Sequence, residues 1–260
     1  MRVDYHTHST YSDGRFMWSM CEAAQRANLE AIGFADHCNV SPREPQQRAK
    51  AALGFNLDMT YERRREAIDA MNERFDLTVH DGIEMDFDSR DIDEIAAFLE
   101  EADFEYAIGS VHHLDGMNVH VEPYFAKKDE QETVALVDEF YSEAVALIES
   151  ELFDIAAHVD LVERNPALRD YATEDHFHRV AEAAENSRTL LEINAGRILG
   201  EYGEFHPGPD FMEILDSYDI EFVLSTDGHT PEEVVERTEE LEKFAAAHGL
   251  DTTELALQGD

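Results

Sequence analysis

Short apolar runs alternate along the chain with longer segments in which apolar residues recur at the spacing of a helix. Seven such runs predict strands at Val3–Tyr5, Ala31–Ala35, Leu77–Ile83, Tyr106–Val111, Leu152–Ala157, Leu190–Asn194 and Phe222–Ser225. The segments after them predict helices at about Met17–Ala27, Asp58–Arg74, Asp91–Glu100, Glu130–Ser150, Glu174–Asn186, Pro209–Tyr218 and Pro231–His248. The region Asn39–Leu57, which contains prolines and glycine, is predicted to be a long loop on the rim.

A strand followed by a helix, repeated along a chain, predicts parallel strands joined by right-handed crossovers. Seven units of this kind favour a closed α/β barrel, slightly smaller than the usual eight-stranded one. An open, doubly wound sheet is the alternative. No internal repeat, low-complexity tract or linker divides the chain, so we expect one domain that spans residues 1–260.

Side chains that can bind metals follow the predicted strands. His6 and His8 stand two residues apart, on one face of an extended chain, and Asp13 follows in a turn closed by Gly14. The later strand ends carry Asp36, His37, Glu84, His112, His158, Asp227 and His229. The C-terminal strand ends of a barrel meet on one face, so six of the 13 histidines and three of these carboxylates are expected to form one site. The three carboxylates are those of Asp13, Glu84 and Asp227.

The mixture of ligands indicates the kind of metal site. Imidazole and carboxylate groups suit zinc, manganese or iron, and Cys21 and Cys38 are too few for a structural zinc site. Nine candidate ligands exceed the three or four of one catalytic zinc, so two or three divalent metal ions are predicted. Glu84 and Asp227 are the best candidates for bridging because each carboxylate has two oxygens.

Composition bears on where the protein works and what it binds. With 59 acidic and 20 basic residues the formal net charge is −39, and such a surface repels itself unless salt screens it. We interpret this charge as an adaptation to the cytosol of a halophile. The charge also argues against a nucleic-acid partner. The sequence shows neither a signal peptide nor an apolar run of bilayer length, which predicts a cytoplasmic protein without a membrane partner.

Taken together, these residues resemble the metal-binding positions of the PHP (polymerase and histidinol phosphatase) family. Nine positions match in order across nearly the whole chain, namely His6, His8, Asp13, His37, Glu84, His112, His158, Asp227 and His229. The resemblance implies the PHP fold, a distorted (βα)7 TIM-like barrel that holds up to three metals and hydrolyses phosphate esters. The stretches Gly109–His113, His158–Leu161 and Leu191–Asn194 are similar to the stand-alone histidinol-phosphatase branch. Two stretches, Ser12-Asp13-Gly14 and Ala195-Gly196-Arg197, depart from that branch.

The resemblance implies a small phosphate monoester as substrate, with histidinol phosphate of histidine biosynthesis as the first candidate. A hydroxide that bridges two metals is expected to attack phosphorus in line while the ions stabilise the departing alkoxide. Glu84 and Asp227 are therefore predicted to be essential for catalysis. Asp36 is predicted either to orient a metal ligand, which is the favoured role, or to protonate the leaving group.

Two arginines are the predicted contacts for the substrate phosphate. Arg164 follows the fifth strand and Arg197 follows the sixth, so both belong on the site face of the barrel. A guanidinium group matches phosphate oxygens two at a time. His206, in the loop between residues 203 and 209, is a further candidate for substrate binding.

Two other functions stay open. A PHP phosphoesterase that acts on nucleotides or short oligonucleotides needs an aromatic platform for stacking a base, which Tyr11, Phe16 and Trp18 could supply. A non-catalytic regulatory domain would keep the metal ligands without the reaction. The remaining histidines are expected to lie outside the metal cluster, with His113 still able to line the substrate pocket, and they are His80, His113, His120, His176, His178 and His248.

Overall fold

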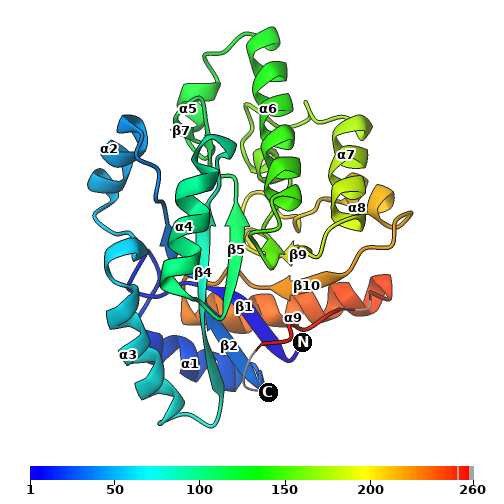
Figure 1. Cartoon of the computed structure of the whole chain (residues 1–260). Coiled ribbons are helices and arrows are strands. Elements are labelled where there is room, and N and C mark those ends of the chain that lie inside the picture. Colours follow the sequence, from blue (N-terminus) through cyan, green and yellow to red (C-terminus); the bar gives the residue numbers. More distant parts are fainter. Residues whose placement is uncertain (251, 258–260) are drawn as a thin grey trace.

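Seven parallel strands form the centre of the molecule (Figure 1). The computed structural model describes residues 1–250 and 252–257. In the order in which they pair, the strands are β1 (Val3–Thr7), β2 (Ala31–Phe34), β4 (Thr78–Asp86), β5 (Tyr106–Ser110), β8 (Ile155–Ala156), β9 (Leu190–Asn194) and β10 (Phe222–Ser225). Every neighbouring pair in this order is parallel, as the alternation of strands and helices predicted.

The last strand returns to the first. Thr7, at the end of β1, forms a parallel bridge with Gly228, just beyond β10. The amide of His8 donates a hydrogen bond of 2.9 Å to the carbonyl of Gly228. The strands therefore form a nearly closed barrel, which confirms the predicted (βα)7 TIM-like barrel and rules out the open sheet.

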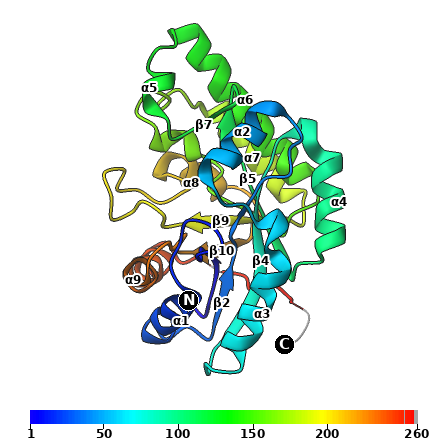
Figure 2. The ribbon, with the colours of Figure 1, turned by 90° about the vertical axis from the view of Figure 1, so that its left-hand side faces the viewer.

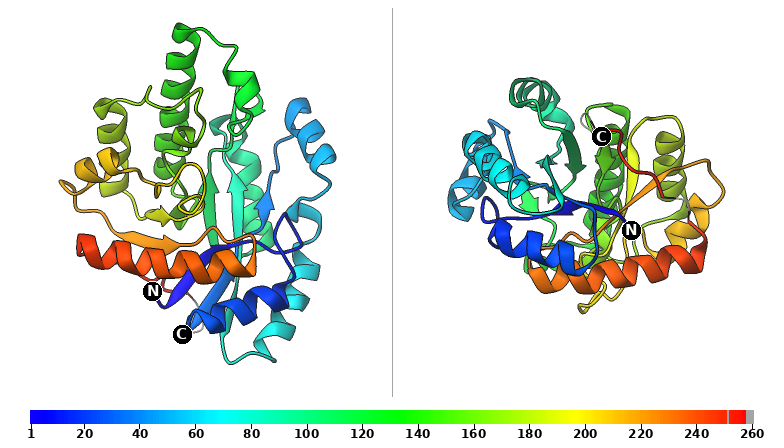
Figure 3. Two further views of the ribbon diagram at one scale, coloured as in Figure 1. Left: turned by 180° about the vertical axis from the view of Figure 1, so that it is seen from behind. Right: turned by 90° about the horizontal axis from the view of Figure 1, so that it is seen from below.

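Seven helices surround the barrel at the predicted places. They are α1 (Met17–Arg26), α3 (Tyr61–Asn72), α4 (Ile92–Ala102), α6 (Glu130–Glu149), α7 (Glu174–Glu185), α8 (Pro209–Leu215) and α9 (Pro231–His248). The view from below in Figure 3 shows α1 and α9 lying side by side along one flank. Within the described part of the chain, no helix has the length and apolar composition that crossing a bilayer requires.

The predicted loop at Asn39–Leu57 is wrong, because a helix, α2 (Glu44–Leu53), occupies most of it. Pro45 stands in the first turn of α2, where a missing amide hydrogen costs nothing. Gly54 ends the helix in the left-handed conformation, at φ 77°, and its amide donates to the Lys50 carbonyl. The residues that suggested a loop are thus the boundaries of a helix, which Figures 1 and 2 both show above α3.

Three short strands and one short α-helix were not predicted at all. A short strand, β3 (His37–Cys38), pairs with the C-terminal half of β4 and lengthens β4 beyond its predicted end. A hairpin of β6 (His113–Leu114) and β7 (Met117–Asn118) turns at Asp115 and Gly116, both at positive φ. One further helix, α5 (Glu122–Phe125), follows the hairpin. The hairpin and α2 stand at the C-terminal end of the strands, where they can wall a site.

Candidate metal centre

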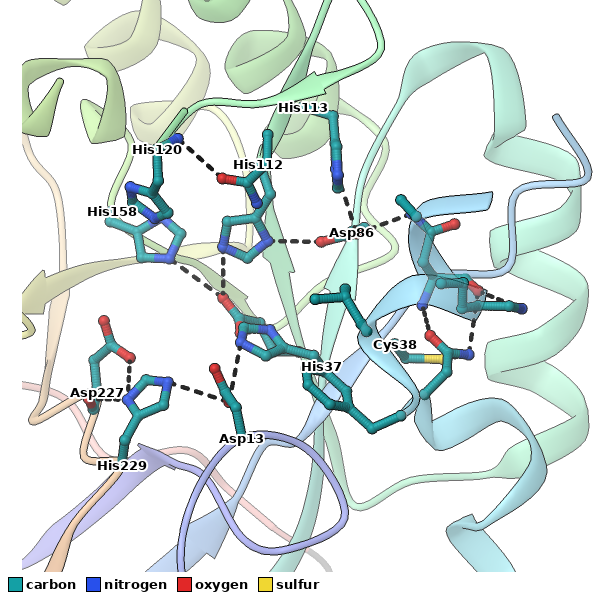
Figure 4. Close-up of a pocket in the computed structure, with 18 of the residues that line it drawn as sticks. Asp13, His37, Cys38, Asp86, His112, His113, His120, His158, Asp227 and His229 are labelled. Atoms are coloured by element: carbon teal, nitrogen blue, oxygen red, sulfur yellow. Dashed lines mark hydrogen bonds and ion pairs between the residues drawn. The ribbon is translucent and has the colours of Figure 1, made fainter. Parts of the chain in front are cut away.

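The nine predicted ligands come together at the C-terminal ends of the strands. Seven of them line one cavity, namely Asp13, His37, Glu84, His112, His158, Asp227 and His229. His6 and His8 are fully buried directly against this group. Figure 4 shows Asp227 and His158 on one side of the cavity and Cys38 on the other, with His37 between them. Residues from both halves of the chain thus converge on one point.

Glu84 is the centre of the cluster. Its Oε1 lies 3.2 Å from His158 Nε2 and 3.4 Å from His112 Nε2. Its Oε2 lies 2.6 Å from His37 Nδ1 and 3.4 Å from His6 Nε2. The two oxygens therefore face different sets of imidazoles, which is the arrangement a bridging carboxylate needs.

A second group of ligands surrounds His8. Its Nε2 lies 3.4 Å from Asp227 Oδ1, and its ring stacks on His229 with the centroids 4.1 Å apart. Asp13 Oδ1 lies 3.4 Å from His229 Nε2 and 3.6 Å from His37 Nε2. The other oxygen of Asp227, Oδ2, lies 3.4 Å from Arg164 instead of facing a second set of histidines. The geometry is therefore more favourable for bridging at Glu84 than at Asp227.

The imidazoles around the buried carboxylates counteract the effect of burial on the carboxylate pKa values. Burial alone would raise the pKa of Glu84, but the neighbouring imidazoles, His37 foremost, hold it well below its usual range. The pKa of Asp227 is lowered in the same way, against its burial, by His8 and His6. In turn, Glu84 raises the pKa of His37 to about 10 against its burial. Divalent cations would compensate the same buried negative charge without requiring protonated histidines.

Metal ions fit the atoms at this centre. His6 Nε2, His8 Nε2 and Glu84 Oε2 are buried and form no hydrogen bond, a state that costs free energy unless another partner is present. Three overlapping sets of side chains each bring ligand atoms within 4.8 Å of one another. They are His8, Asp13, His37 and His229; His6, His8 and Asp227; and His37, Glu84 and His112. Imidazole and carboxylate atoms in such sets suit zinc, manganese or iron.

Two carboxylates that the sequence reasoning missed hold the ligands in place. Asp86 Oδ1 lies 2.6 Å from His112 Nδ1, and Glu192 Oε1 lies 2.7 Å from His6 Nδ1. Both contacts turn the Nε2 atom of the histidine toward Glu84. Glu192 also accepts a hydrogen bond from the backbone amide of His158 at 3.2 Å. Asp86 stands two residues after Glu84 on β4, so strand periodicity could have found it.

Asp36 lies outside the cavity, under the turn that follows β1. It accepts hydrogen bonds from the Ser9 amide at 2.7 Å and from the Ser12 hydroxyl at 2.6 Å. Arg64, itself fully buried, donates to its other oxygen at 3.0 Å. The pKa of Asp36 is lowered despite its burial, chiefly by Arg64. This placement suits the orientation of the turn that carries His8 and Asp13, and it gives Asp36 no access to a leaving group.

The two predicted phosphate contacts line the cavity, but the predicted histidine does not. Arg164 and Arg197 both face the cavity. The Arg197 side chain is exposed and forms no hydrogen bond or ion pair with a described residue. His206 was expected in an exposed loop, but it is fully buried, and Arg164 stands between it and the cavity. The physical reason is an antiparallel bridge between His206 and Asn194, which folds the loop back onto β9.

Gly196 gives the floor of the site its shape. A Cβ atom built on Gly196 would overlap Asp227 Oδ2 and would stand 2.7 Å from Arg164 Nη2 and 2.8 Å from Asn194 Oδ1. Two of the predicted ligands also adopt the left-handed backbone conformation that non-glycine residues rarely use, since His158 has φ 30° and Asp227 has φ 50°. Such strain clusters at functional sites because the surrounding structure has to enforce it.

The other histidines are distributed as follows. His113 and His120 line the cavity on the hairpin side without joining any of the three ligand sets. His80, on β4, contacts Glu105, and His248 contacts the backbone of α9. His176 and His178 lie on α7, away from the cavity.

The proposed stacking platform is not at the site. Tyr11, Phe16 and Trp18 do not line the cavity, and Trp18 packs against Phe75 and Arg74 instead. Among the described residues, Phe55 is the one Phe, Tyr or Trp that lines the cavity, and its ring stacks on His37 with the centroids 6.2 Å apart.

A barrel of parallel strands with clustered histidines and carboxylates at its C-terminal mouth defines a class, the metal-dependent hydrolases built on an α/β barrel. The sequence profile of the PHP domain matches residues 4–196, more than half of the chain. The chain therefore belongs to the PHP domain family. It is a phosphoesterase of the histidinol-phosphatase-like kind, with a site for more than one metal ion.

Known relatives agree with this assignment. The chain is 28% identical over 218 residues to a probable histidinol-phosphatase of Deinococcus radiodurans, which covers 82% of this chain and 80% of the relative. The histidinol phosphate phosphatase of Lactococcus lactis, solved with zinc, L-histidinol and phosphate, superposes with a TM-score of 0.74 at 21% identity. That match covers 96% of this chain and 95% of the other. A putative histidinol phosphatase of Listeria monocytogenes gives a TM-score of 0.69 at 16% identity, covering 89% of this chain and 96% of that one.

Proposed function

We propose that the protein hydrolyses histidinol phosphate to histidinol and inorganic phosphate. The observation that carries the proposal is the convergence of the ligand cluster around Glu84 with two cavity-lining arginines, Arg164 and Arg197. Cations on one side and guanidinium groups on the other are what a phosphate monoester dianion requires. The similarity to histidinol phosphatases supports histidinol as the leaving group.

The nine ligands would hold the ions, with Glu84 shared between two of them. When bound, divalent cations supply Lewis acidity and a water nucleophile at neutral pH, because coordination lowers the pKa of water. Asp86 and Glu192 keep His112 and His6 oriented for ligation. No serine or cysteine nucleophile is needed, and burial raises the pKa of the Cys38 thiol, which keeps it protonated.

The residues around the metal cluster bind the rest of the substrate. Arg197, without a side-chain partner among the described residues, is available to phosphate oxygens. The alcohol portion would occupy the part of the cavity between α2 and the hairpin. This wall offers Asn39, Phe55, His113, Asn118 and His120. It is polar enough to contact an imidazole and an amino group, and it contains Phe55 as an apolar surface.

Phosphate release at high salt, with the protein loaded with zinc or manganese, tests the proposal. The substrates to compare are histidinol phosphate, a nucleoside 5′-monophosphate and a 3′,5′-bisphosphate. We expect kcat/KM for histidinol phosphate to exceed the other two by roughly a hundredfold or more. A preference for either nucleotide would overturn the substrate assignment. Absence of phosphate release from all three by the metal-loaded protein would support a non-catalytic metal-binding domain instead.

A further inference from the structure

His206 stands between Asp160 and Arg164 and contacts both. Asp160 Oδ1 lies 2.5 Å from His206 Nδ1, and Arg164 Nε donates to His206 Nε2 at 2.8 Å. The other oxygen of Asp160 accepts a hydrogen bond of 2.7 Å from the Gly208 amide. The ring of Tyr202 stacks on His206 with centroids 4.9 Å apart and an interplanar angle of 10°. The imidazole is thus held at both nitrogens and on one face.

The contact with Arg164 fixes the tautomer of His206. A guanidinium group can only donate hydrogen bonds, so His206 Nε2 must accept and cannot carry a proton. Nδ1 then carries the proton and donates a hydrogen bond to Asp160 Oδ1. Burial lowers the pKa of the His206 imidazole, in agreement with a neutral ring.

Arg164 is oriented from one side by these contacts. Its Nη2 donates to Asn194 Oδ1 at 3.1 Å and lies 3.4 Å from Asp227 Oδ2. Its Nη1 forms no hydrogen bond with any residue in the described ranges, although the side chain lines the cavity. Nη1 is therefore the donor that remains for a ligand in the cavity.

We propose that His206, held by Asp160, is a positioning residue that fixes the Arg164 guanidinium for the substrate phosphate. The inference rests on the proposed phosphate-binding role of Arg164. A free arginine side chain has many rotamers, and a contact that orders it beforehand removes the ordering cost from ligand binding. His206 itself does not touch the substrate, because Arg164 stands between the imidazole and the cavity.

Two substitutions test separately the contacts made by the two nitrogens of His206. His206→Asn can keep a donor near Nδ1 for Asp160 but has no acceptor at Nε2. His206→Gln can place an oxygen near Nε2 and so can accept from Arg164. The measurement is the affinity of the metal-loaded protein for inorganic phosphate by titration calorimetry. We expect His206→Asn to weaken it about tenfold to a hundredfold, the loss of one hydrogen bond to a charged group, and His206→Gln to restore much of the affinity.

A double variant tests whether His206 acts through Arg164. In an Arg164→Ala background, His206→Asn should cause no further loss of phosphate affinity. A loss of equal size with and without Arg164 overturns the proposal, and so does wild-type affinity in His206→Asn. His248→Asn, the same change at an exposed site, is the matched control and should bind phosphate like the wild type.

Folding failure would not remove the test. If His206→Asn does not fold, Arg164→Lys replaces it, since an ammonium group keeps the charge but lacks the Nε–H that His206 accepts. We expect a similar loss, and wild-type phosphate affinity in Arg164→Lys refutes the proposal. The outcomes also separate the two hypotheses. A wild-type protein that leaves histidinol phosphate intact refutes the proposed function, whereas unchanged phosphate affinity in His206→Asn refutes this inference alone.

Discussion

At the scale of single residues, the two oxygens of Glu84 explain why one carboxylate can organise the whole centre. Each oxygen faces its own pair of close imidazoles, so a cation bound beside Oε1 and another beside Oε2 would share one ligand. The same position makes Glu84 costly without cations, because a buried carboxylate needs opposite charge nearby. Stability of the centre and metal loading are thus coupled through one side chain.

Glu84→Ala should abolish turnover while the fold remains. Loss of a shared ligand weakens two cation sites at once, so we expect kcat for phosphate release to fall by more than about a hundredfold. Asp227→Ala should act similarly through the ligand set of His8. Bound metal should fall in both variants when measured by plasma mass spectrometry, with an unchanged circular dichroism spectrum. Glu236→Ala, at an exposed position on α9, is the control, and full activity in Glu84→Ala would refute the assignment.

Gly196→Ala should impair phosphate binding more than stability. The added methyl group would overlap the Asp227 carboxylate and press on Arg164, so both groups must move. We expect kcat/KM to fall by roughly tenfold to a hundredfold, with a change in unfolding free energy below about 2 kcal/mol. Gly200→Ala is the matched control, because the nearest atom to its Cβ would be 3.4 Å away. Equal kinetics in the two variants would contradict the close approach at Gly196.

At the scale of elements, the candidate ligands and the residues that orient them stand two positions apart on the strands, so their side chains lie on the same face. On β4 these residues are Glu84 and Asp86, and on β9 they are Glu192 and Asn194. His6 lies on β1 and His8 directly follows it, with the same spacing. The convergence of the candidate ligands could be predicted because each histidine among them follows an apolar run. Strand periodicity could have pointed to Asp86, two residues after Glu84, but no comparable signal marks Glu192, whose partner His6 stands 186 positions away.

The helices also show which parts of the fold the hydrophobic pattern of the sequence could not predict. Periodicity located seven of them, because each buries an apolar stripe against the barrel. It missed α2, whose only buried residue is Gln46, so no apolar stripe marks it. It also missed the fold of the loop that carries His206, because that path depends on a backbone bridge to β9. Segments that wall the cavity rather than the core were thus the least predictable.

Arg64→Met should show how much the buried ion pairs of α3 contribute to the stability of the protein. Arg64, on α3, is fully buried and contacts Asp36, Asp81 and the Gly82 carbonyl. Methionine would remove the positive charge that faces two buried carboxylates. Breaking a buried ion pair in this way lowers the free energy of unfolding by about 3–5 kcal/mol. Urea unfolding measures the loss. Arg48→Met, which breaks an exposed pair on α2, should cost below about 0.5 kcal/mol, and equal losses would contradict the role of the buried network.

At the scale of the whole molecule, charge and function oppose each other. A formal charge of −39 repels an anionic substrate, and only local cations can reverse this field inside the cavity. Arg164 and Arg197 stand there, beside a cluster able to hold divalent ions. Salt would weaken the repulsion at the surface far more than the attraction in the buried site, since buried charges are screened less. High salt is therefore compatible with activity on a phosphate ester.

The same charge predicts that the fold needs salt. The Debye length is about 10 Å at 0.1 M salt and about 3 Å at 1 M. Repulsion among the 59 acidic residues is therefore strong in dilute buffer and largely screened at molar salt. We expect the midpoint of thermal unfolding to rise by roughly 10 °C between 0.1 and 2 M KCl. For a chain of this size, such a shift corresponds to a gain of about 3 kcal/mol in the free energy of unfolding. A triple variant with Glu22, Glu232 and Glu236 changed to Gln should need less salt, because all three side chains are exposed. A midpoint equal in both buffers would refute the halophile interpretation, because self-repulsion would then not limit stability.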